Sequence, residues 1–345
     1  MQTPKPDQIE VIAPNLKRRL SGVTATIVRL VPLQADDIGI VATGPGLPSS
    51  VPHVPLWRLP LLPRKRRVWH ARRNTEMLLG LFLKSVLRMP LRLLFTSASQ
   101  RKHTGYTKWL ISKMDMVVAT SSKTAGYLER PARVVLHGID TQAFAPAVDR
   151  AALRQELRLS DGVLVGCYGR IRAQKGTDAF VDAMISILPG RPEVTALVMG
   201  RATESHGAFL EGLKAKVCDA GLDGRIRFLP EVTVDRMADW YRILDLYVAP
   251  QRWEGFGLTP VEAMACGVPV VATRVGAFEE IVTPQTGALV APDDIPALAD
   301  ATAEFLDDPA RRAAASGAAR ARAEESFRIE GEAAALIAIY REMLA

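Results

Sequence analysis

Apolar and polar positions alternate along this chain in a way that predicts a parallel α/β protein. Short apolar runs recur between segments of helical periodicity, and no tandem repeat is present. This alternation is typical of sheets built from βαβ units. The predicted strands are 9–13, 38–43, 68–70, 92–96, 116–120 and 133–136, then 163–168, 195–199, 225–229, 246–249, 268–272 and 287–290.

The predicted strands fall into two sets of six, which indicates two Rossmann-like domains. Residues 143–160, between the sets, are polar and contain Pro146, and 345 residues are enough for two separate cores. We therefore expect one domain at residues 1–150 and a second at residues 151–325. The alanine-rich tail, 309–345, is expected to form two helices after the last strand, and residues 326–345 form the second of them.

Composition excludes several classes of protein. An apolar fraction of 48% excludes a mainly disordered chain. The chain contains no secretory leader pattern and no charge-free apolar run of about 18 residues, the length a spanning helix needs. Its three cysteines lack the spacing of a disulfide framework or a zinc module, which fits a reducing compartment. We expect a cytoplasmic protein, free or resting on a membrane surface.

The net charge of +7 hides a strong asymmetry. Residues 58–133 hold 17 Lys and Arg against three acidic residues, a charge of +14, so the rest of the chain carries −7. Such a segment indicates an anionic partner, and both nucleic acid and an anionic membrane surface are compatible with the charge alone. No RNP1 pattern, zinc finger or heptad-bearing basic helix accompanies it, which argues against nucleic acid.

The segment 249–273 carries the most specific pattern. Glu254 and Glu262 are separated by seven residues that include a Gly-Phe-Gly sequence, where the backbone can approach a ligand closely. Residues 259–262 also fit a capping box, with Thr259 as N-cap and Glu262 three residues later, which would be a purely structural role. We favour a ligand clamp, because two carboxylates without a metal motif suit the hydroxyl pairs of a sugar or a ribose.

This segment resembles the Glu-x7-Glu motif of family 4 retaining glycosyltransferases, which have the GT-B fold. Residues 169–176, GRIRAQKG, resemble the G-R-x4-K-G turn that opens the donor domain of that family. Residues 137–146 resemble its N-G-V-D-x3-F-x-P signature, and residues 15–26 resemble its glycine-containing loop. The resemblance implies two Rossmann-like domains facing across a cleft, with helix 326–345 crossing back to the first. It also implies that residues 1–150 bind the acceptor and residues 151–325 the nucleotide-sugar donor.

The resemblance also implies roles for individual residues. Arg170 and Lys175 would contact the donor diphosphate, Glu254 the sugar hydroxyls and Glu262 the ribose, and Arg170, Lys175 and Glu254 are the expected catalytic residues. The chain has no Asp-x-Asp pair to hold a metal ion, so fixed cations must offset the charge that grows on the leaving diphosphate. We therefore expect a metal-independent enzyme without a cofactor. The remaining expected donor contacts are Gly22, Gly169, Gly255, Phe256, Gly257 and Leu258.

The first domain departs from the family at one position. Many relatives have a histidine near the reacting centre in a segment like F-H-T-S, but residues 93–100 here, LLFTSASQ, contain none. His70 ends the preceding predicted strand and His103 follows the departure. His70 facing the reacting centre and His70 packing in the core are equally compatible with the sequence.

Residues 67–80 and 94–115 resemble lipopolysaccharide core mannosyltransferases. That resemblance implies GDP-mannose as donor and, as acceptor, an anionic glycolipid carrying the acidic sugar Kdo. It places the enzyme in the cytoplasm, with peripheral contact on the cytoplasmic face of the inner membrane. Helix 76–87 could lie on anionic lipid or be an ordinary helix of the domain. The expected acceptor-binding residues are His70, Arg72, Arg73, Arg101 and Lys102.

Two other functions are compatible with the sequence. One is a GT-B transferase that uses UDP-glucose or UDP-GlcNAc on another lipid or soluble acceptor. The other is a nucleic-acid-binding protein on a degenerate transferase scaffold, which the intact motif residues disfavour. Among minor features, we expect Trp253 to pack, Asp140 to cap a turn, and Cys167 and Cys266 to be buried and inert.

Overall fold

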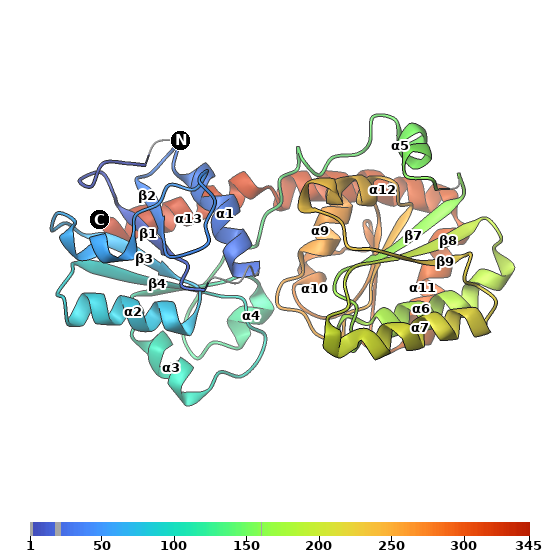
Figure 1. Ribbon diagram of the computed structural model, residues 1–345, viewed down its shortest axis with the longest axis horizontal. Helices are drawn as coiled ribbons and strands as arrows, with labels where there is room; N and C mark the ends of the chain where they lie inside the picture. The colour runs from blue at the N-terminus through green and yellow to red at the C-terminus, as the bar shows by residue number, and fades with distance from the viewer. Residues whose placement is uncertain (1–2, 18–21, 160) are drawn as a thin grey trace. The chain divides into compact units, whose positions relative to one another are not determined.

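The chain forms two compact units in the computed structural model (Figure 1), which describes residues 3–17, 22–159 and 161–345. One unit comprises Met1–Gly138 together with Ile329–Ala345, and the other comprises Ile139–Arg328. Each contains a six-stranded parallel sheet, so the predicted α/β class is confirmed. All twelve predicted strands are present, with ends shifted by a few residues at most.

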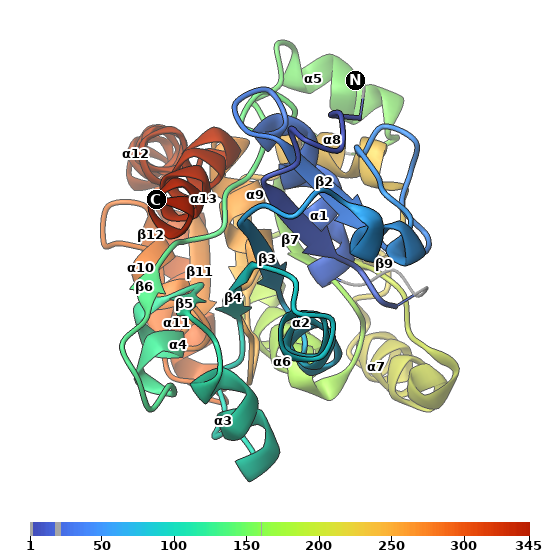
Figure 2. The ribbon, with the colours of Figure 1, turned by 90° about the vertical axis from the view of Figure 1, so that its left-hand side faces the viewer.

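The sheet of the first unit has the order β2-β1-β3-β4-β5-β6. Its core is split between two faces, because alternate residues of each strand point to opposite sides. Val11 and Ala13 of β1 pack with α1 and α13, whereas Ile12 packs with α2 and α3. Figure 2 shows α13 and α2 on either side of β3 and β4. The elements are β1 (Val11–Pro14), α1 (Gly22–Gln34), β2 (Ile40–Thr43), β3 (Arg67–Ala71), α2 (Asn74–Ser85), β4 (Leu91–Ser97), α3 (Gly105–Ser112), β5 (Met116–Ala119), α4 (Ser122–Gly126), β6 (Arg133–Val134) and α13 (Ile329–Leu344).

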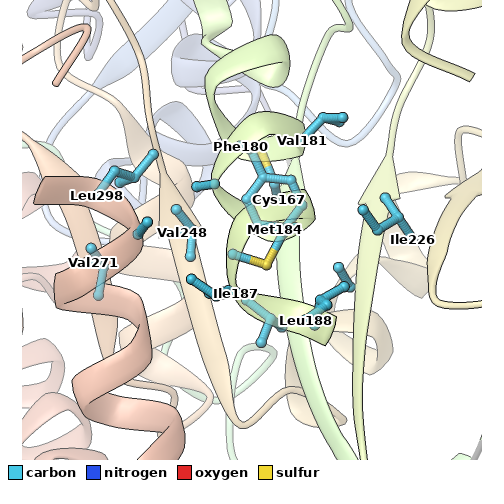
Figure 3. Close-up of a cluster of buried hydrophobic side chains, with 14 of the residues drawn as sticks. Cys167, Phe180, Val181, Met184, Ile187, Leu188, Ile226, Val248, Val271 and Leu298 are labelled. Atoms are coloured by element: carbon cyan, nitrogen blue, oxygen red, sulfur yellow. The ribbon is translucent and has the colours of Figure 1, made fainter. Parts of the chain in front are cut away.

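The second unit has the order β12-β11-β10-β7-β8-β9, with every described pairing parallel. Phe180 and Met184 of α6 pack against Val248 of β10 and Leu298 of α11 in one of its cores (Figure 3). The elements are α5 (Arg150–Glu156), β7 (Val163–Tyr168), α6 (Thr177–Ile187), β8 (Val194–Met199), α7 (Gly207–Asp219), β9 (Ile226–Leu229), α8 (Met237–Arg242), β10 (Leu246–Ala249), α9 (Leu258–Ala265), β11 (Val270–Thr273), α10 (Phe278–Ile281), β12 (Gly287–Val290), α11 (Ile295–Asp307) and α12 (Pro309–Ser326).

The alanine-rich tail forms two helices, as predicted. α12 belongs to the second unit and α13 to the first. Leu336, Ile337 and Tyr340 of α13 are buried in the core that α1 shares with the sheet. The Glu332 carboxylate of α13 also accepts from the Gly138 N–H at 2.8 Å. This bond joins the two segments of the first unit, Met1–Gly138 and Ile329–Ala345.

Candidate functional site

The candidate donor site lies in the second unit, at the carboxyl ends of β7 and β10. These two strands are neighbours, yet the chain runs from β7 through β8 and β9 on one side before it returns to β10 on the other. Open parallel sheets bind ligands outside the carboxyl ends of the strands at such a reversal of strand order. The loop after β7 carries Lys175 and the loop after β10 carries Glu254, so the fold brings these two predicted residues together.

Lys175 and Glu254 form an ion pair across 79 residues of sequence. Their side chains are 21% and 18% exposed, so both are shielded but reachable. The second carboxylate oxygen of Glu254, Oε1, accepts from the Gly255 N–H at 3.0 Å. A fixed ammonium group beside an oriented carboxylate offers one group that attracts phosphate and one that accepts from hydroxyls.

The loop after β7 begins as a tight turn. Gly169 has a φ of 139° and donates its N–H to the Met199 carbonyl at 2.9 Å. Arg170 follows it and is exposed. Gly176, in the left-handed region with a φ of 70°, precedes α6, and a Cβ there would collide with the Pro250 carbonyl. Glycine at this position therefore lets the loop that carries Lys175 touch the loop that follows β10.

Arg252 fastens the two loops to each other, a role that the sequence did not predict. Its backbone N–H donates to the Gln174 carbonyl at 3.0 Å, and its guanidinium group bonds both oxygens of Asp178 at 2.7 and 3.0 Å. The hydrogen bond to Asp178 raises the pKa of Arg252. A bidentate pair of this kind fixes geometry as well as charge. Its only signal in the sequence is an arginine two residues before Glu254, which a solvated arginine would match equally well.

The helix after Glu254, α9, does not begin with the capping box that residues 259–262 would form. α9 starts at Leu258, and its N-cap is Gly257, at a φ of 89°, rather than Thr259. A Cβ at Gly257 would collide with the Phe278 ring and the Glu254 side chain, which is why the chain needs glycine there. Phe256 is buried, and its carbonyl accepts from the Ala277 N–H at 3.1 Å. The expected backbone contacts, 255–258, thus form the entry to α9, beside Glu254.

Glu262 lies on α9 and is partly exposed. Its Oε2 accepts from the hydroxyl of Tyr241, on α8, at 2.7 Å. Burial, with the nearby Glu262 carboxylate as a smaller cause, raises the pKa of Tyr241 well above its usual value, so the phenol stays protonated. The two glutamates are therefore held by different groups, Glu254 by an ammonium and Glu262 by a neutral phenol.

The predicted acceptor residues lie in the first unit, and two of them follow β3. Strand order reverses between β1 and β3, as it does between β7 and β10. Arg73 lies there, with Nη1 3.1 Å from Asn15 Oδ1 and 2.8 Å from Glu76 Oε1, and its side chain is 12% exposed. The Arg72 guanidinium donates to the His70 carbonyl at 3.3 Å. Both arginines are thus partly engaged in holding the end of β3.

The other predicted ligand-binding residues of the first unit, apart from His70, lie on its surface. Arg101 and Lys102 are exposed on the loop after β4. Gly22 is exposed where α1 begins. Within the glycine-containing loop expected at residues 15–26, residues 18–21 lie outside the described part of the chain.

His70 is fully buried at the centre of the first unit. Its Nδ1 is 2.7 Å from the Tyr340 hydroxyl and its Nε2 is 2.6 Å from Thr96 Oγ1. Burial, assisted by the Arg72 charge, lowers the pKa of His70 well below its usual value. Of the two interpretations of this histidine, the geometry favours a neutral ring that ties β3 to β4 and α13.

The structure also bears on several minor predictions. Trp253 is 40% exposed, so more than half of its surface is covered, and its packing role stays a prediction. The backbone N–H of the residue before it, Arg252, is bonded to η2 (Ala173–Lys175). Asp140 caps its turn, accepting from the N–H groups of residues 142 and 143 at 2.9 Å. Burial raises the pKa of both Cys167 and Cys266 to about 12, as expected for inert thiols.

The structure also shows how α2 is divided between core and surface. Met77, Gly80 and Leu83 are buried, whereas Leu78, Phe82 and nearby Val86 are exposed. No helix among residues 3–17, 22–159 and 161–345 is long and apolar enough to cross a membrane. In the same described residues, no group of three or more His, Cys, Asp or Glu is arranged to hold a metal ion.

Comparison with known proteins agrees with this geometry. Residues 162–308, which contain both donor-site loops, match the family described as glycosyl transferases group 1. The chain is 55% identical to the lipopolysaccharide core biosynthesis mannosyltransferase LpsB of Rhizobium meliloti, over 97% of this chain and 98% of that protein. The chain belongs to the group 1 glycosyltransferase family.

Two further comparisons extend this result. This glycosyltransferase is 51% identical to the mannosyltransferase LpcC of Rhizobium leguminosarum, over 97% of each chain. The crystal structure of Anabaena HepE in complex with UDP superposes with a TM-score of 0.85 at 18% identity, over 97% of this chain and 100% of that one. At that identity the likeness concerns the fold alone, and it confirms the two-domain GT-B class predicted from the sequence.

Proposed function

We propose that this glycosyltransferase transfers mannose from GDP-mannose to an anionic glycolipid, the Kdo-containing inner core of lipopolysaccharide, with retention at the anomeric carbon. The observation that carries the proposal is the 55% identity to a lipopolysaccharide core mannosyltransferase over nearly the whole of both chains. The pairing of Lys175 with Glu254 at the β7–β10 reversal supports it, because a nucleotide sugar needs both a phosphate-binding cation and a hydroxyl acceptor.

In this proposal the second unit binds the donor. Arg170 and Lys175 bind the diphosphate, with Gly169 and the N–H groups at the start of α9 close by, and Glu254 accepts from the mannose hydroxyls. Lys175 exchanges its carboxylate partner for a phosphate oxygen as the donor binds. Its charge then stabilises the negative charge that develops on the leaving GDP, as preorganised cations do in a shielded site. Glu262 accepts from the ribose, and Gly22, in the first unit, remains a further expected donor contact.

The first unit binds the acceptor, with its basic residues facing the carboxylates and phosphates of the glycolipid. Arg101 and Lys102 are exposed and suited to direct contact. Arg72 and Arg73 add positive charge at the end of β3, where strand order reverses. We assign His70 an orienting role behind these arginines, since both of its ring nitrogens are bonded within the unit.

We further propose peripheral contact with the cytoplasmic face of the inner membrane. The α2–α3 patch is defined as Leu78, Phe82, Val86, Tyr106 and Trp109. These exposed residues lie on, or directly after, two neighbouring helices of the first unit. The Tyr106 and Trp109 rings stack with centroids 6.3 Å apart. Exposed aromatic and aliphatic side chains beside basic residues are the composition of a surface that rests in a lipid interface.

A screen of donors against acceptors tests the proposed function. The purified enzyme is given GDP-mannose, UDP-glucose or UDP-GlcNAc with a Kdo-bearing lipid A acceptor, and release of the nucleoside diphosphate is measured in the presence of EDTA. We expect turnover with GDP-mannose and only with the Kdo-bearing lipid, rather than with the same lipid without Kdo. Turnover confined to a UDP-sugar would overturn the donor assignment, and a strict need for Mn²⁺ would overturn the role given to the side-chain cations.

A further inference from the structure

Three tyrosines lie together beneath the donor site of the second unit. Tyr168 ends β7, Tyr241 belongs to α8 and Tyr247 belongs to β10, and all three are buried. The Tyr241 ring centroid lies 5.3 Å from that of Tyr168 and 5.5 Å from that of Tyr247. The rings form one packed cluster, but their hydroxyl groups have different partners.

Two of the three hydroxyls serve the fold. Tyr168 donates to the Trp240 carbonyl at 3.0 Å, and Tyr247 donates to the Tyr168 carbonyl at 3.0 Å. The third hydroxyl, that of Tyr241, donates instead to the Glu262 carboxylate at 2.7 Å. A carboxylate has two oxygens and about four acceptor positions, so Glu262 can accept from the phenol and from ligand hydroxyls at the same time.

The bond from Tyr241 restricts how the Glu262 carboxylate can rotate. Glu262 is partly exposed, and a glutamate has three side-chain torsions to order when a ligand binds. A buried donor, itself packed between two other rings, fixes one carboxylate oxygen in advance. Immobilising such a side chain at the moment of binding weakens affinity by about three- to tenfold, and a preorganised one avoids that loss.

We infer that Tyr241 is a positioning residue that orients Glu262 toward the two hydroxyls of the donor ribose, and so sets the preference for ribonucleotides over nucleotides without those hydroxyls. The inference rests on the proposed function only in that Glu262 meets the ribose of a nucleotide. It does not depend on which base or sugar the donor carries, because all ribonucleotide donors share the ribose.

The test compares binding of GDP with binding of 2′,3′-dideoxy-GDP, which lacks both hydroxyls. Calorimetry gives the ratio of the two dissociation constants for the wild type, Tyr241→Phe, Tyr247→Phe and Glu262→Ala. We expect Tyr241→Phe to reduce the ratio by about three- to tenfold. Tyr247→Phe is the matched control, because it removes from the same cluster a buried hydroxyl that bonds the Tyr168 carbonyl and Thr259 rather than Glu262. Its ratio should equal that of the wild type.

A double variant separates positioning from mere packing. In Tyr241→Phe with Glu262→Ala the ratio should match that of Glu262→Ala alone, because Tyr241 acts through Glu262. With GDP-mannose as substrate, Tyr241→Phe should raise KM while kcat stays within about twofold.

The outcomes distinguish this inference from the proposed function. Suppose that Glu262→Ala lowers the ratio of dissociation constants while Tyr241→Phe leaves it at the wild-type value. Tyr241 then does not position Glu262, and the donor assignment stands. If the wild type binds UDP and not GDP, the donor assignment fails, and the same variants with UDP and 2′,3′-dideoxy-UDP decide the role of Tyr241. If no nucleoside diphosphate binds the wild type, both proposals fall.

Discussion

Lys175 is the residue on which the proposed chemistry depends most. Its ammonium group is held at Glu254, in a loop that Arg252 fastens in place. Replacing it with methionine keeps most of the side-chain volume and removes the charge that stabilises the leaving diphosphate. Removing one such preorganised group from a transition state lowers kcat by about 10²- to 10³-fold. We expect a loss of that size for Lys175→Met in the GDP-release assay.

Lys214 provides the control for this prediction. It also pairs with a glutamate, Glu211, but on the exposed surface of α7. Exposed pairs of this kind contribute little to stability, and Lys214→Met should therefore retain the wild-type rate within about twofold. A wild-type rate for Lys175→Met would remove Lys175 from the mechanism.

His70 makes a prediction about pH at the same scale. Its pKa is lowered in the folded protein by burial and by Arg72, whereas in the unfolded chain a histidine titrates near pH 6.5, about its usual value. Below that pH the unfolded chain binds a proton that the folded protein does not. Stability is therefore full above about pH 6.5 and falls as the pH drops below it, by up to about 1.4 kcal/mol per pH unit for this one group.

Urea unfolding at several pH values checks this. Between pH 6.5 and 5.5 the free energy of unfolding of His70→Gln should fall less steeply than that of the wild type. A part of the slope should remain, because burial and neighbouring charges also lower the pKa of His103. Between pH 7 and 8 the two proteins should have parallel profiles. Equal slopes in the acidic range would mean that His70 does not carry the effect.

At the scale of elements, hydrophobic patterning predicted the sheets well. Most strands are short apolar runs that are covered on both faces, as parallel strands usually are, whereas both residues of β6 are exposed. The start of α9 was not recognisable in this way. Residues 259–262 carry ideal capping types, but the crowding of Gly257 against Phe278 and Glu254 sets the N-cap two residues earlier. That crowding is tertiary, and local sequence contains no sign of it.

The candidate site could be predicted only where local sequence patterns mark its residues. Lys175, Glu254 and Glu262 lie within motifs, so their spacing identified them. Arg252 and Tyr241 act through partners 74 and 21 residues away, Asp178 and Glu262. No local pattern specifies such pairs. The sequence also did not determine which apolar residues of α2 are exposed. Periodicity shows where apolar residues line up along a helix, but not whether the protein core covers them.

At the scale of the whole molecule, charge is divided between the two units. The +14 segment, residues 58–133, lies entirely in the first unit, within Met1–Gly138. Basic residues near an anionic bilayer contribute roughly 1 kcal/mol each, and salt screens that attraction within about 10 Å at 0.1 M. The α2–α3 patch adds an apolar contribution that salt does not screen. The two contributions together predict binding that needs anionic lipid and is weakened, not abolished, by salt.

Vesicle co-sedimentation tests the membrane contact. We expect the enzyme to bind vesicles containing phosphatidylglycerol, and to bind them less as KCl rises from about 50 to 500 mM, where the screening length shortens to a few ångströms. Replacing Phe82 and Trp109 with serine should weaken binding by about tenfold, because two large apolar side chains no longer enter the interface. Val234 is 89% exposed but lies in the second unit, so Val234→Ser is the control and should bind like the wild type. Equal binding by all three proteins would show that the α2–α3 patch does not contact the membrane, and binding to purely zwitterionic vesicles at the same strength would show that the basic segment does not direct it.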